Sequence, residues 1–301
     1  MRIAIVGLGK MGSQIARKLH EGGHTVIASN RSSGAVDEMK SLGMIGAYTK
    51  EEVVSSFGTD QVIVWLMIPS DTVDAELDTW LRLVPVGSIL IDGGNSKWSD
   101  TKRRAEAVLA QGSTLIDIGT SGGVWGYQNG FSMMVGGDSA SFEIIKPILE
   151  TLKNPEGMYA HFGESGSGHY VKMVHNAIEY GMMQSLAEGY HILKEGPYKD
   201  IDLYKAGEVW QHHSVITSWL NELTRDIMKV NPNQDGVEGK VTESGEARWA
   251  LEVAKEFNIE TRAIQSSFDV RLDSQKGLVN YATKLVASMR NAFGGHKINE
   301  K

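Results

Sequence analysis

The hydrophobic pattern of the chain changes near residue 166. Before this point, short apolar runs alternate with longer stretches of helical spacing, and this alternation predicts a parallel sheet flanked by helices. The predicted strands are residues 3–6, 25–28, 62–67, 88–91, 114–117 and 131–135. The pattern therefore predicts an α/β domain with a parallel sheet over residues 1–165.

Beyond residue 166 the strand signals fade and helical spacing continues almost without interruption. The predicted helices are residues 203–210, 214–230, 245–257 and 275–291. We therefore expect an all-α domain over residues 166–301. The glycine-rich run 163–168 would join the two domains, and because ligand sites tend to lie in clefts between domains, we expect a site near this junction.

One segment of the second half carries polar side chains where a helix normally carries apolar ones. If residues 172–180 are helical, Lys172, His175, Asn176, Glu179 and Tyr180 share one face, at the offsets that usually point toward a core. Lys172 and Glu179 are two turns apart, roughly 10 Å along the axis, which suits the opposite ends of a small ligand. The convergence predicts a functional site. The alternative is a solvated helix face with an accidental pattern.

A glycine-rich segment directly follows the first predicted strand. It reads G-L-G-K-M-G and opens a helix that continues through Ile15 and Leu19, the context that a dinucleotide-binding fingerprint requires. Gly7 permits a tight turn, Gly9 lets the backbone approach a pyrophosphate, and Gly12 allows the helix to pack closely on the strand. We predict a Rossmann-type domain whose loop binds the dinucleotide through Gly7, Leu8, Gly9, Lys10, Met11 and Gly12. A glycine-rich turn without a ligand is the alternative.

The end of the second predicted strand indicates which dinucleotide binds. An NAD-binding unit usually places an acidic residue there to accept a hydrogen bond from the ribose 2′-hydroxyl, but this chain has Asn30, Arg31 and Ser32. Arg31 can bind a 2′-phosphate through charge-assisted hydrogen bonds, Ser32 adds a hydroxyl, and Asn30 can contact the ribose. We therefore predict NADP, with NAD possible if Arg31 only stacks on the adenine.

Composition and charge narrow the class of protein. The 301 residues have 41% hydrophobic and 22% charged residues, which is typical of a globular protein, and a length that favours two domains. The net charge of −7, without a basic stripe, argues against nucleic acid as a partner. The absence of cysteine excludes disulfides and thiolate metal sites. We expect a cytoplasmic protein with no membrane segment and no signal peptide.

Three motifs together resemble one enzyme family. They are D-G-G-N-S at residues 92–96, S-G-G-V-W-G at 121–126, and K-M-V-H-N-A-I-E-Y at 172–180. With the glycine-rich loop and the F-G-G-H run at 293–296, the chain closely resembles the decarboxylating 6-phosphogluconate dehydrogenases, in their shorter form. The resemblance implies oxidation and decarboxylation of 6-phosphogluconate to ribulose 5-phosphate and carbon dioxide, with reduction of NADP or NAD. It also implies that the helical domain binds substrate and forms the subunit interface.

The resemblance also assigns roles to individual residues. It makes Lys172 the general base and Glu179 the general acid, and no metal is needed. Residues matching the family's sugar-acid contacts are Asn95, Ser121, Gly122, Gly123, His175, Asn176 and Tyr180. Arg271 would bind the phosphate, while Arg290 and His296 match tail residues that reach a neighbouring subunit's site, which implies a homodimer or homotetramer with shared sites. Met67, Ile68, Pro69 and Asn95 match cofactor contacts.

One departure from the family pattern affects the phosphate end. Long-form relatives carry a phosphate-binding lysine where this chain has Ser244, and Ser244 itself or Arg248 is available to substitute. A second reading is a β-hydroxyacid dehydrogenase of the same architecture that oxidises without decarboxylation. His175, Glu179 and Asn95 argue against it. A third reading, a non-catalytic nucleotide or sugar-phosphate sensor, conflicts with the intact Lys172 and Glu179.

Overall fold

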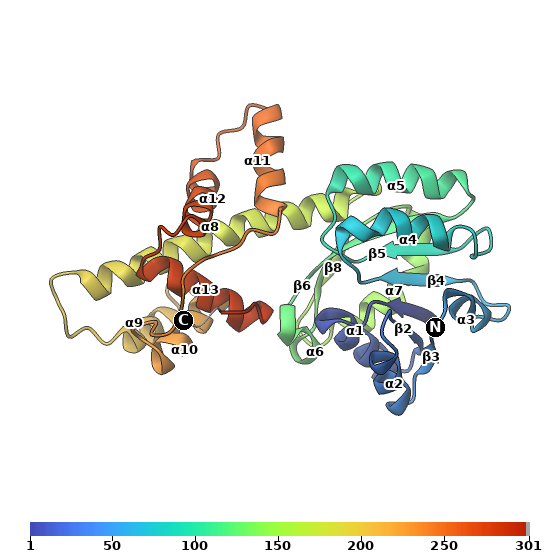
Figure 1. The fold of residues 1–301 in the computed structure, drawn as a ribbon, viewed down its shortest axis with the longest axis horizontal. Coiled ribbons are helices and arrows are strands. Elements are labelled where there is room, and N and C mark those ends of the chain that lie inside the picture. Colours follow the sequence, from blue (N-terminus) through green and yellow to red (C-terminus); the bar gives the residue numbers. More distant parts are fainter. Residues whose placement is uncertain (299–301) are drawn as a thin grey trace. The chain divides into compact units, whose positions relative to one another are not determined.

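The computed structural model describes residues 1–298 and forms two compact units (Figure 1). The first unit is Met1–Lys172 and the second begins at Met173. The predicted domain boundary after residue 165 lies just before helix α8 (Ser167–Glu195), whereas the division between the units falls inside this helix. No described helix is long and apolar enough to cross a membrane.

The first unit is built on one sheet of eight strands. Their bounds are β1 (Arg2–Val6), β2 (Thr25–Ser29), β3 (Ile45–Ala47), β4 (Ile63–Leu66), β5 (Ile89–Asp92), β6 (Thr114–Ser121), β7 (Ser132–Gly136) and β8 (Tyr159–His161). The spatial order is β3-β2-β1-β4-β5-β6-β7-β8, which contains the 3-2-1-4-5-6 order of a Rossmann-type fold. All six predicted strands are present. The three-residue strands β3 and β8 were not predicted.

Neighbouring strands of the sheet are parallel except β6 and β7. Strand β7 pairs antiparallel with β6, and Ile118 lies opposite Val135. The segment 122–131 that joins β6 to β7 is too short for a parallel crossover, which needs about a dozen residues or more and usually a helix. The expectation of an entirely parallel sheet is therefore wrong at this strand, and β8 continues the sheet parallel to β7.

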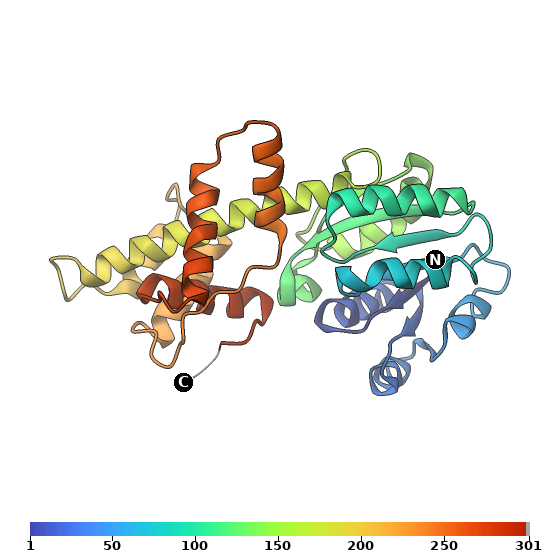
Figure 2. The same ribbon diagram turned by 45° about the horizontal axis from the view of Figure 1, so that its top comes forward.

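Helices cover both faces of this sheet (Figures 1 and 2). Their bounds are α1 (Lys10–Glu21), α2 (Ser33–Ser41), α3 (Lys50–Ser55), α4 (Val73–Trp80), α5 (Trp98–Ala110), α6 (Gly126–Asn129) and α7 (Ser139–Lys153), with 3₁₀ turns at Ser70–Thr72 and Gly123–Trp125. Alternate strand residues face opposite sides: Ile3 and Ile5 join the core under α1, α2 and α7, whereas Ala4 and Val6 join the core under α3, α4 and α5. A sheet buried on both faces explains the continuous apolar strands.

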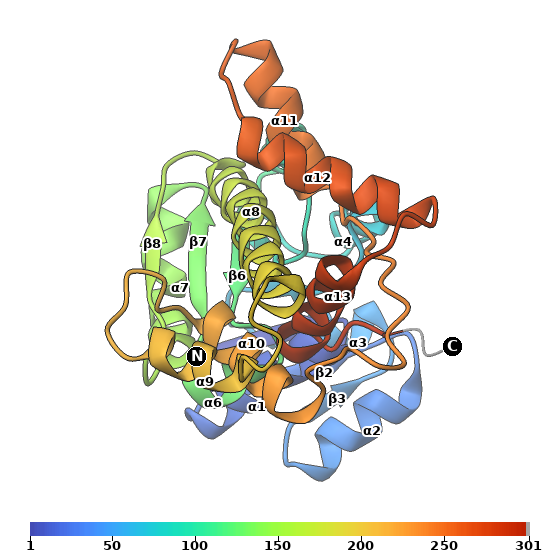
Figure 3. The ribbon, with the colours of Figure 1, turned by 90° about the vertical axis from the view of Figure 1, so that its left-hand side faces the viewer.

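The second unit consists of helices joined by loops, and its described part contains no β-strand (Figure 3). After α8 come α9 (Leu203–Gln211), α10 (Trp219–Val230), α11 (Glu246–Glu256), α12 (Arg262–Gln275) and α13 (Tyr281–Gly294). Helix α13 contacts α10 and α12, and a shared core includes Met183, Tyr190 and Leu285. The fold class predicted from the sequence, a Rossmann-type α/β domain followed by an all-α domain, is confirmed.

Two helix boundaries differ from those predicted. Helix α13 begins six residues later than the predicted start at 275, because Gly277 adopts a positive φ of 95° and Asn280 forms a capping box with Thr283. Helix α10 begins at Trp219 rather than at 214, where the Ser218 side chain accepts a hydrogen bond from the Asn221 amide. Helix α12, which carries Arg271, was not predicted.

Candidate active site

The glycine loop lies at the carboxyl end of β1, where the strand order reverses between β1 and β4. Gly7 has a φ of 97°, and a Cβ there would overlap the Met67 carbonyl group. A Cβ on Gly12 would overlap the Gly7 carbonyl group, so both glycines are required by the protein's own packing. A Cβ on Gly9 would meet no heavy atom within 4 Å. Packing does not explain Gly9, whereas the close approach of a pyrophosphate does, so the loop fits the dinucleotide.

The end of β2 supports this loop from the side. The Asn30 Oδ1 atom accepts a hydrogen bond of 3.0 Å from the Leu8 amide, and its Nδ2 atom donates to Ser32 Oγ over 2.8 Å. Asn30 therefore braces the loop, which is a structural role beyond the predicted contact with the ribose. Arg31 and Ser32 are exposed beside it, and Met67–Pro69 directly follow the neighbouring strand β4.

The D-G-G-N-S motif follows β5 at the same edge of the sheet. Asp92 is fully buried, and its two oxygens accept hydrogen bonds from the Gly94 amide (3.1 Å) and the Ser96 hydroxyl (2.6 Å). The buried Arg104 donates to Ser96 Oγ over 3.2 Å and forms an ion pair of 3.5 Å with Asp92. Asn95 is exposed between these anchored residues, and its contact with a ligand stays a prediction.

Lys172 lies over strand β6, just before the S-G-G loop. A Cβ on Gly119 would lie 2.8 Å from Lys172 Cγ, so the missing side chain makes room for the lysine stem. Lys172 is buried, and Ser121, Gly122 and Gly123 are half-buried beyond the same strand. Because β1, β4, β5 and β6 are parallel, the first unit gathers the glycine loop, Asn95, the S-G-G loop and Lys172 at one edge of its sheet.

The start of α8 is held by a carboxylate that the sequence analysis did not single out. The fully buried Asp117 accepts hydrogen bonds from the amides of Gly166 (2.7 Å) and His169 (2.8 Å). The His169 Nδ1 atom lies 2.8 Å from Thr101 Oγ1, which ties this turn to α5. A negative charge at a helix N-terminus is favourable, so Asp117 fixes the turn from which Lys172 projects.

In the second unit, two polar residues of α8 are better protected from water than their apolar neighbours. The Glu179 side chain is 23% exposed and Tyr180 is 4% exposed, whereas the apolar residues Val174 and Ile178 are 36% and 51% exposed. His175 Nδ1 lies 2.9 Å from Asn176 Oδ1 and 4.0 Å from Glu179 Oε2. Glu179 and Tyr180 are thus more protected than the neighbouring apolar residues, which argues against a solvated, accidental pattern, whereas the His175 side chain is 37% exposed.

Two buried arginines lie near these residues in the same unit. The Arg271 guanidinium lies over the Tyr180 ring, 3.2 Å from its centroid, and Arg290 donates to Thr242 Oγ1 over 3.0 Å. Burial lowers the pKa of Arg271 to about 10, while Tyr180 opposes this shift, and burial also lowers the pKa of Arg290. Both side chains remain charged at neutral pH and provide a cationic region for an anion.

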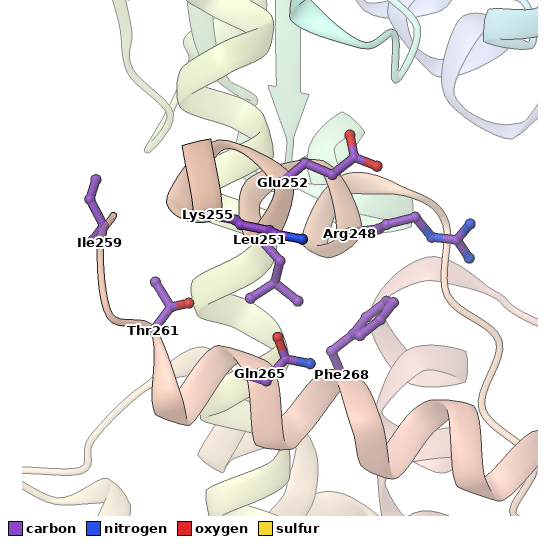
Figure 4. A pocket seen from close by; sticks show the side chains of 8 residues that line it. All are labelled: Arg248, Leu251, Glu252, Lys255, Ile259, Thr261, Gln265 and Phe268. Atoms are coloured by element: carbon purple, nitrogen blue, oxygen red, sulfur yellow. The ribbon is translucent and has the colours of Figure 1, made fainter. Parts of the chain in front are cut away.

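The segment around Ser244 shows how this chain differs from the family pattern. Ser244 donates its backbone amide to the Tyr180 hydroxyl over 3.2 Å. Arg248, the other suggested substitute for the lysine, pairs with Glu243 and lines a pocket of about 430 Å³ between α11 and α12 (Figure 4). The charge of Arg248 is thus balanced by Glu243, and the substitution of the family's lysine by Ser244 or Arg248 stays a prediction.

The remaining predicted residue is at the chain's end. His296 is exposed beyond α13, with its carbonyl accepting a hydrogen bond of 2.6 Å from Asn291. In the single chain, Arg290 contacts its own Thr242, and the sharing of sites between subunits stays a prediction. Among residues 1–298, no group of three or more His, Cys, Asp or Glu side chains is placed to hold a metal ion.

Glu246 is a further buried polar residue that the sequence pattern does not predict. This carboxylate is 2% exposed and accepts a hydrogen bond of 2.9 Å from Asn176 Nδ2. Glu246 is the first residue of α11, a position typical of an acid that complements a helix dipole, and no sequence pattern connects it with the polar face of α8.

Comparisons with known proteins agree with the geometry. A family model described as the NAD binding domain of 6-phosphogluconate dehydrogenase matches residues 2–162, and one described as the C-terminal domain of 6-phosphogluconate dehydrogenase matches residues 168–283. A Haloferax volcanii protein named as an NAD(+)-dependent, decarboxylating 6-phosphogluconate dehydrogenase is 35% identical over 303 residues, covering 100% of this chain and 99% of that protein.

Two solved structures show the same fold. Plasmodium falciparum 6-phosphogluconate dehydrogenase, described in complexes with its cofactor NADP+ and with its substrate, has a TM-score of 0.83 at 27% identity. The match covers 92% of this chain but 63% of that longer chain. Mycobacterium tuberculosis 3-hydroxyisobutyrate dehydrogenase has a TM-score of 0.74 at 19% identity and shows a likeness of fold alone. The two family models and the full-length relative show that the chain belongs to the 6-phosphogluconate dehydrogenase family, a family of NAD- or NADP-dependent oxidoreductases.

Proposed function

We propose that the protein catalyses the oxidative decarboxylation of 6-phosphogluconate to ribulose 5-phosphate and carbon dioxide, with reduction of NADP or NAD. The observation that carries the proposal is the protected polar face of α8, on which Lys172 is buried and Glu179 is largely shielded from water. Apolar residues at these positions would stabilise the helix better, so the polar ones favour a chemical role.

The dinucleotide would be held by the glycine loop at residues 7–12 and by residues 67–69 after β4. Held there, the dinucleotide would supply the hydride acceptor for oxidation at C3 of the substrate. The open space at Gly9 supports contact between the backbone and the pyrophosphate. The exposed Arg31, with no acidic residue at the end of β2, favours NADP, whereas the full-length relative is named as NAD(+)-dependent.

Lys172 would take the proton of the C3 hydroxyl as the hydride leaves, acting as general base. The charged lysine would then polarise the resulting 3-ketone, which lies β to the carboxylate, so that the C1–C2 bond breaks and carbon dioxide departs. The electron pair of that bond forms an enediol, and its oxygen is protonated by the same lysine. The buried position of Lys172 over Gly119 supports a fixed orientation for these transfers.

Glu179 would complete the reaction by protonating the carbon that lost carbon dioxide, which is C1 of the product. The enediol hydroxyl on the next carbon would return its proton to the neutral Lys172, which gives ribulose 5-phosphate. The place of Glu179 two turns beyond Lys172 on α8 suits a different carbon of the substrate. His175 lies 4.0 Å from Glu179 and, with Asn95, Ser121, Asn176 and Tyr180, would contact the sugar acid. Arg271, Arg290 and His296 would bind the phosphate, with the site shared between subunits of a homodimer or homotetramer.

The test is the ratio of carbon dioxide released to cofactor reduced, with 6-phosphogluconate as substrate and NADP and NAD in parallel. We expect a ratio of about one, since each hydride transfer is followed by one loss of carbon dioxide. Reduced cofactor without carbon dioxide would instead identify a β-hydroxyacid dehydrogenase that does not decarboxylate. The absence of any reduction would refute the dehydrogenase proposal.

A further inference from the structure

The helical unit buries one carboxylate for which the proposed chemistry has no role. Glu246 is 2% exposed, and carboxylates are seldom buried to this extent unless both oxygens are hydrogen-bonded or ion-paired. One oxygen, Oε1, accepts a hydrogen bond of 2.9 Å from Asn176 Nδ2. The other, Oε2, is also buried and has no hydrogen-bond donor among residues 1–298. Glu246 therefore keeps one strong acceptor available for a ligand.

An unpaired donor accompanies this unpaired acceptor. Arg271 is 2% exposed, and its NH2 nitrogen has no hydrogen-bond acceptor among the described residues. The carboxylates of Glu246 and Glu179 act on the Arg271 charge and favour its protonated form. Arg271 thus offers a buried donor and Glu246 a buried acceptor, and the two side chains interact electrostatically. Together they are complementary to a ligand that carries both an anionic oxygen and a hydroxyl group.

The charge of Glu246 restricts what its free oxygen can bind. A carboxylate repels phosphate and carboxylate oxygens but accepts hydrogen bonds from hydroxyl groups. The proposed substrate carries hydroxyls at C2, C4 and C5 besides the reacting one at C3, whereas a simple hydroxy acid carries no such chain. An ordinary counterion role for Glu246 would explain its charge but not the acceptor left unpaired beside Asn176.

We propose that Glu246 is a specificity-determining residue whose Oε2 atom accepts a hydrogen bond from one non-reacting hydroxyl of the sugar acid. This inference rests on the proposed function and adds to it a means of selecting polyhydroxylated acids. Asn176 holds the other carboxylate oxygen and so sets the direction of Oε2. A site with a buried acceptor for a hydroxyl discriminates strongly against a substrate that lacks it, because the acceptor is then left desolvated and unpaired.

The experiment compares kcat/KM for 6-phosphogluconate with the values for its 2-deoxy, 4-deoxy and 5-deoxy analogues. For the wild-type enzyme, we expect one analogue to be discriminated against by at least roughly 100-fold. In Glu246→Gln, Nε2 replaces the free oxygen by a donor, and the discrimination should fall below about 10-fold. Glu246→Asp keeps the negative charge but draws the carboxylate back by one methylene group, so it should also reduce the discrimination against the deoxy analogue. It serves as a second variant if Glu246→Gln does not fold.

The controls separate this role from a structural one. Loss of a counterion would lower kcat/KM for all four substrates by the same factor and leave their ratios unchanged, and that result in a folded variant would overturn the proposal. Glu256→Gln changes an exposed carboxylate on the same helix and should leave rates and ratios unaltered. A wild-type enzyme that turns over all four substrates within about 10-fold would overturn this inference alone. A wild-type enzyme inactive on 6-phosphogluconate would overturn the proposed function and this inference with it.

Discussion

The three glycines of the nucleotide loop should respond differently to alanine, because only two of them are required by packing. At Gly7 the φ of 97° and the overlap with the Met67 carbonyl both oppose a Cβ. A left-handed conformation costs an L-residue about 1–2 kcal/mol and overpacking adds about 1–3 kcal/mol, so Gly7→Ala should lose roughly 2–5 kcal/mol. At about 2–4 °C per kcal/mol, the melting temperature should fall by roughly 4–20 °C.

Gly9→Ala should behave in the opposite way. Its φ of −75° is open to alanine, and its Cβ would enter free space. The cost of alanine at a helix N-cap, about 0.5–1 kcal/mol, is largely offset by the lower entropy of the unfolded chain. If the methyl group displaces the pyrophosphate from one charge-assisted hydrogen bond worth about 1.5–3 kcal/mol, dinucleotide affinity should fall by roughly 10- to 150-fold.

The assay is thermal unfolding without ligand, followed by calorimetric titration with NADP and NAD. We expect the Gly7 variant to be destabilised and the Gly9 variant to fold normally but bind the dinucleotide weakly. Wild-type affinity in the Gly9 variant would refute the argument that this position is reserved for a ligand. Wild-type stability in the Gly7 variant would refute the packing argument.

Three further predictions concern charged residues. Lys172→Ala should lower kcat by at least about 100-fold while the calorimetric affinity for NADP stays within about 2-fold, and a wild-type rate would remove Lys172 from the mechanism. Arg31→Ala should raise KM for NADP far more than KM for NAD, since only NADP carries the 2′-phosphate, and equal increases would contradict that assignment. A hydrogen bond from Arg104 lowers the pKa of Asp74 to about 2. The stability that this carboxylate provides is therefore fully present above its unfolded pKa of about 4 and is lost as pH falls through 2. In Asp74→Asn the melting temperature should change less between pH 4 and pH 2 than in the wild type, and an unchanged profile would contradict the linkage.

The sequence predicted the sheet well because its strands are buried on both faces. Runs of four to six residues rich in apolar side chains, each with at most a few polar residues, mark all six predicted strands, and the glycine loop appears in its expected place. The three-residue strands β3 and β8 are too short to show a period. The direction of β7 depends on the length of its connection to β6, which the strand pattern alone does not encode.

Helix α12 was missed for a physical reason that also bears on the site. Its buried face includes Ser267, Arg271 and Ser274 beside Phe268, so the apolar period that identifies a helix is replaced by polar groups. Glu246 was missed because its nearest partner, Asn176, is 70 residues earlier in the chain. Side chains that depend on such distant contacts become apparent only in the folded structure. The assignments of Lys172, Glu179 and the phosphate-binding arginines remain predictions.

The D-G-G-N-S loop has a consequence for how the site can be altered. Asp92, Ser96 and Arg104 are 0%, 3% and 4% exposed and are hydrogen-bonded or ion-paired to one another, while Asn95 alone of the motif is exposed. Most residues of this motif therefore form a rigid scaffold that holds the one exposed side chain, Asn95, in place. Because this loop is already ordered without a ligand, its backbone loses little conformational entropy when a ligand binds. Substitution of Asn95 alone should therefore change the ligand contacts of this loop without disturbing its buried hydrogen bonds.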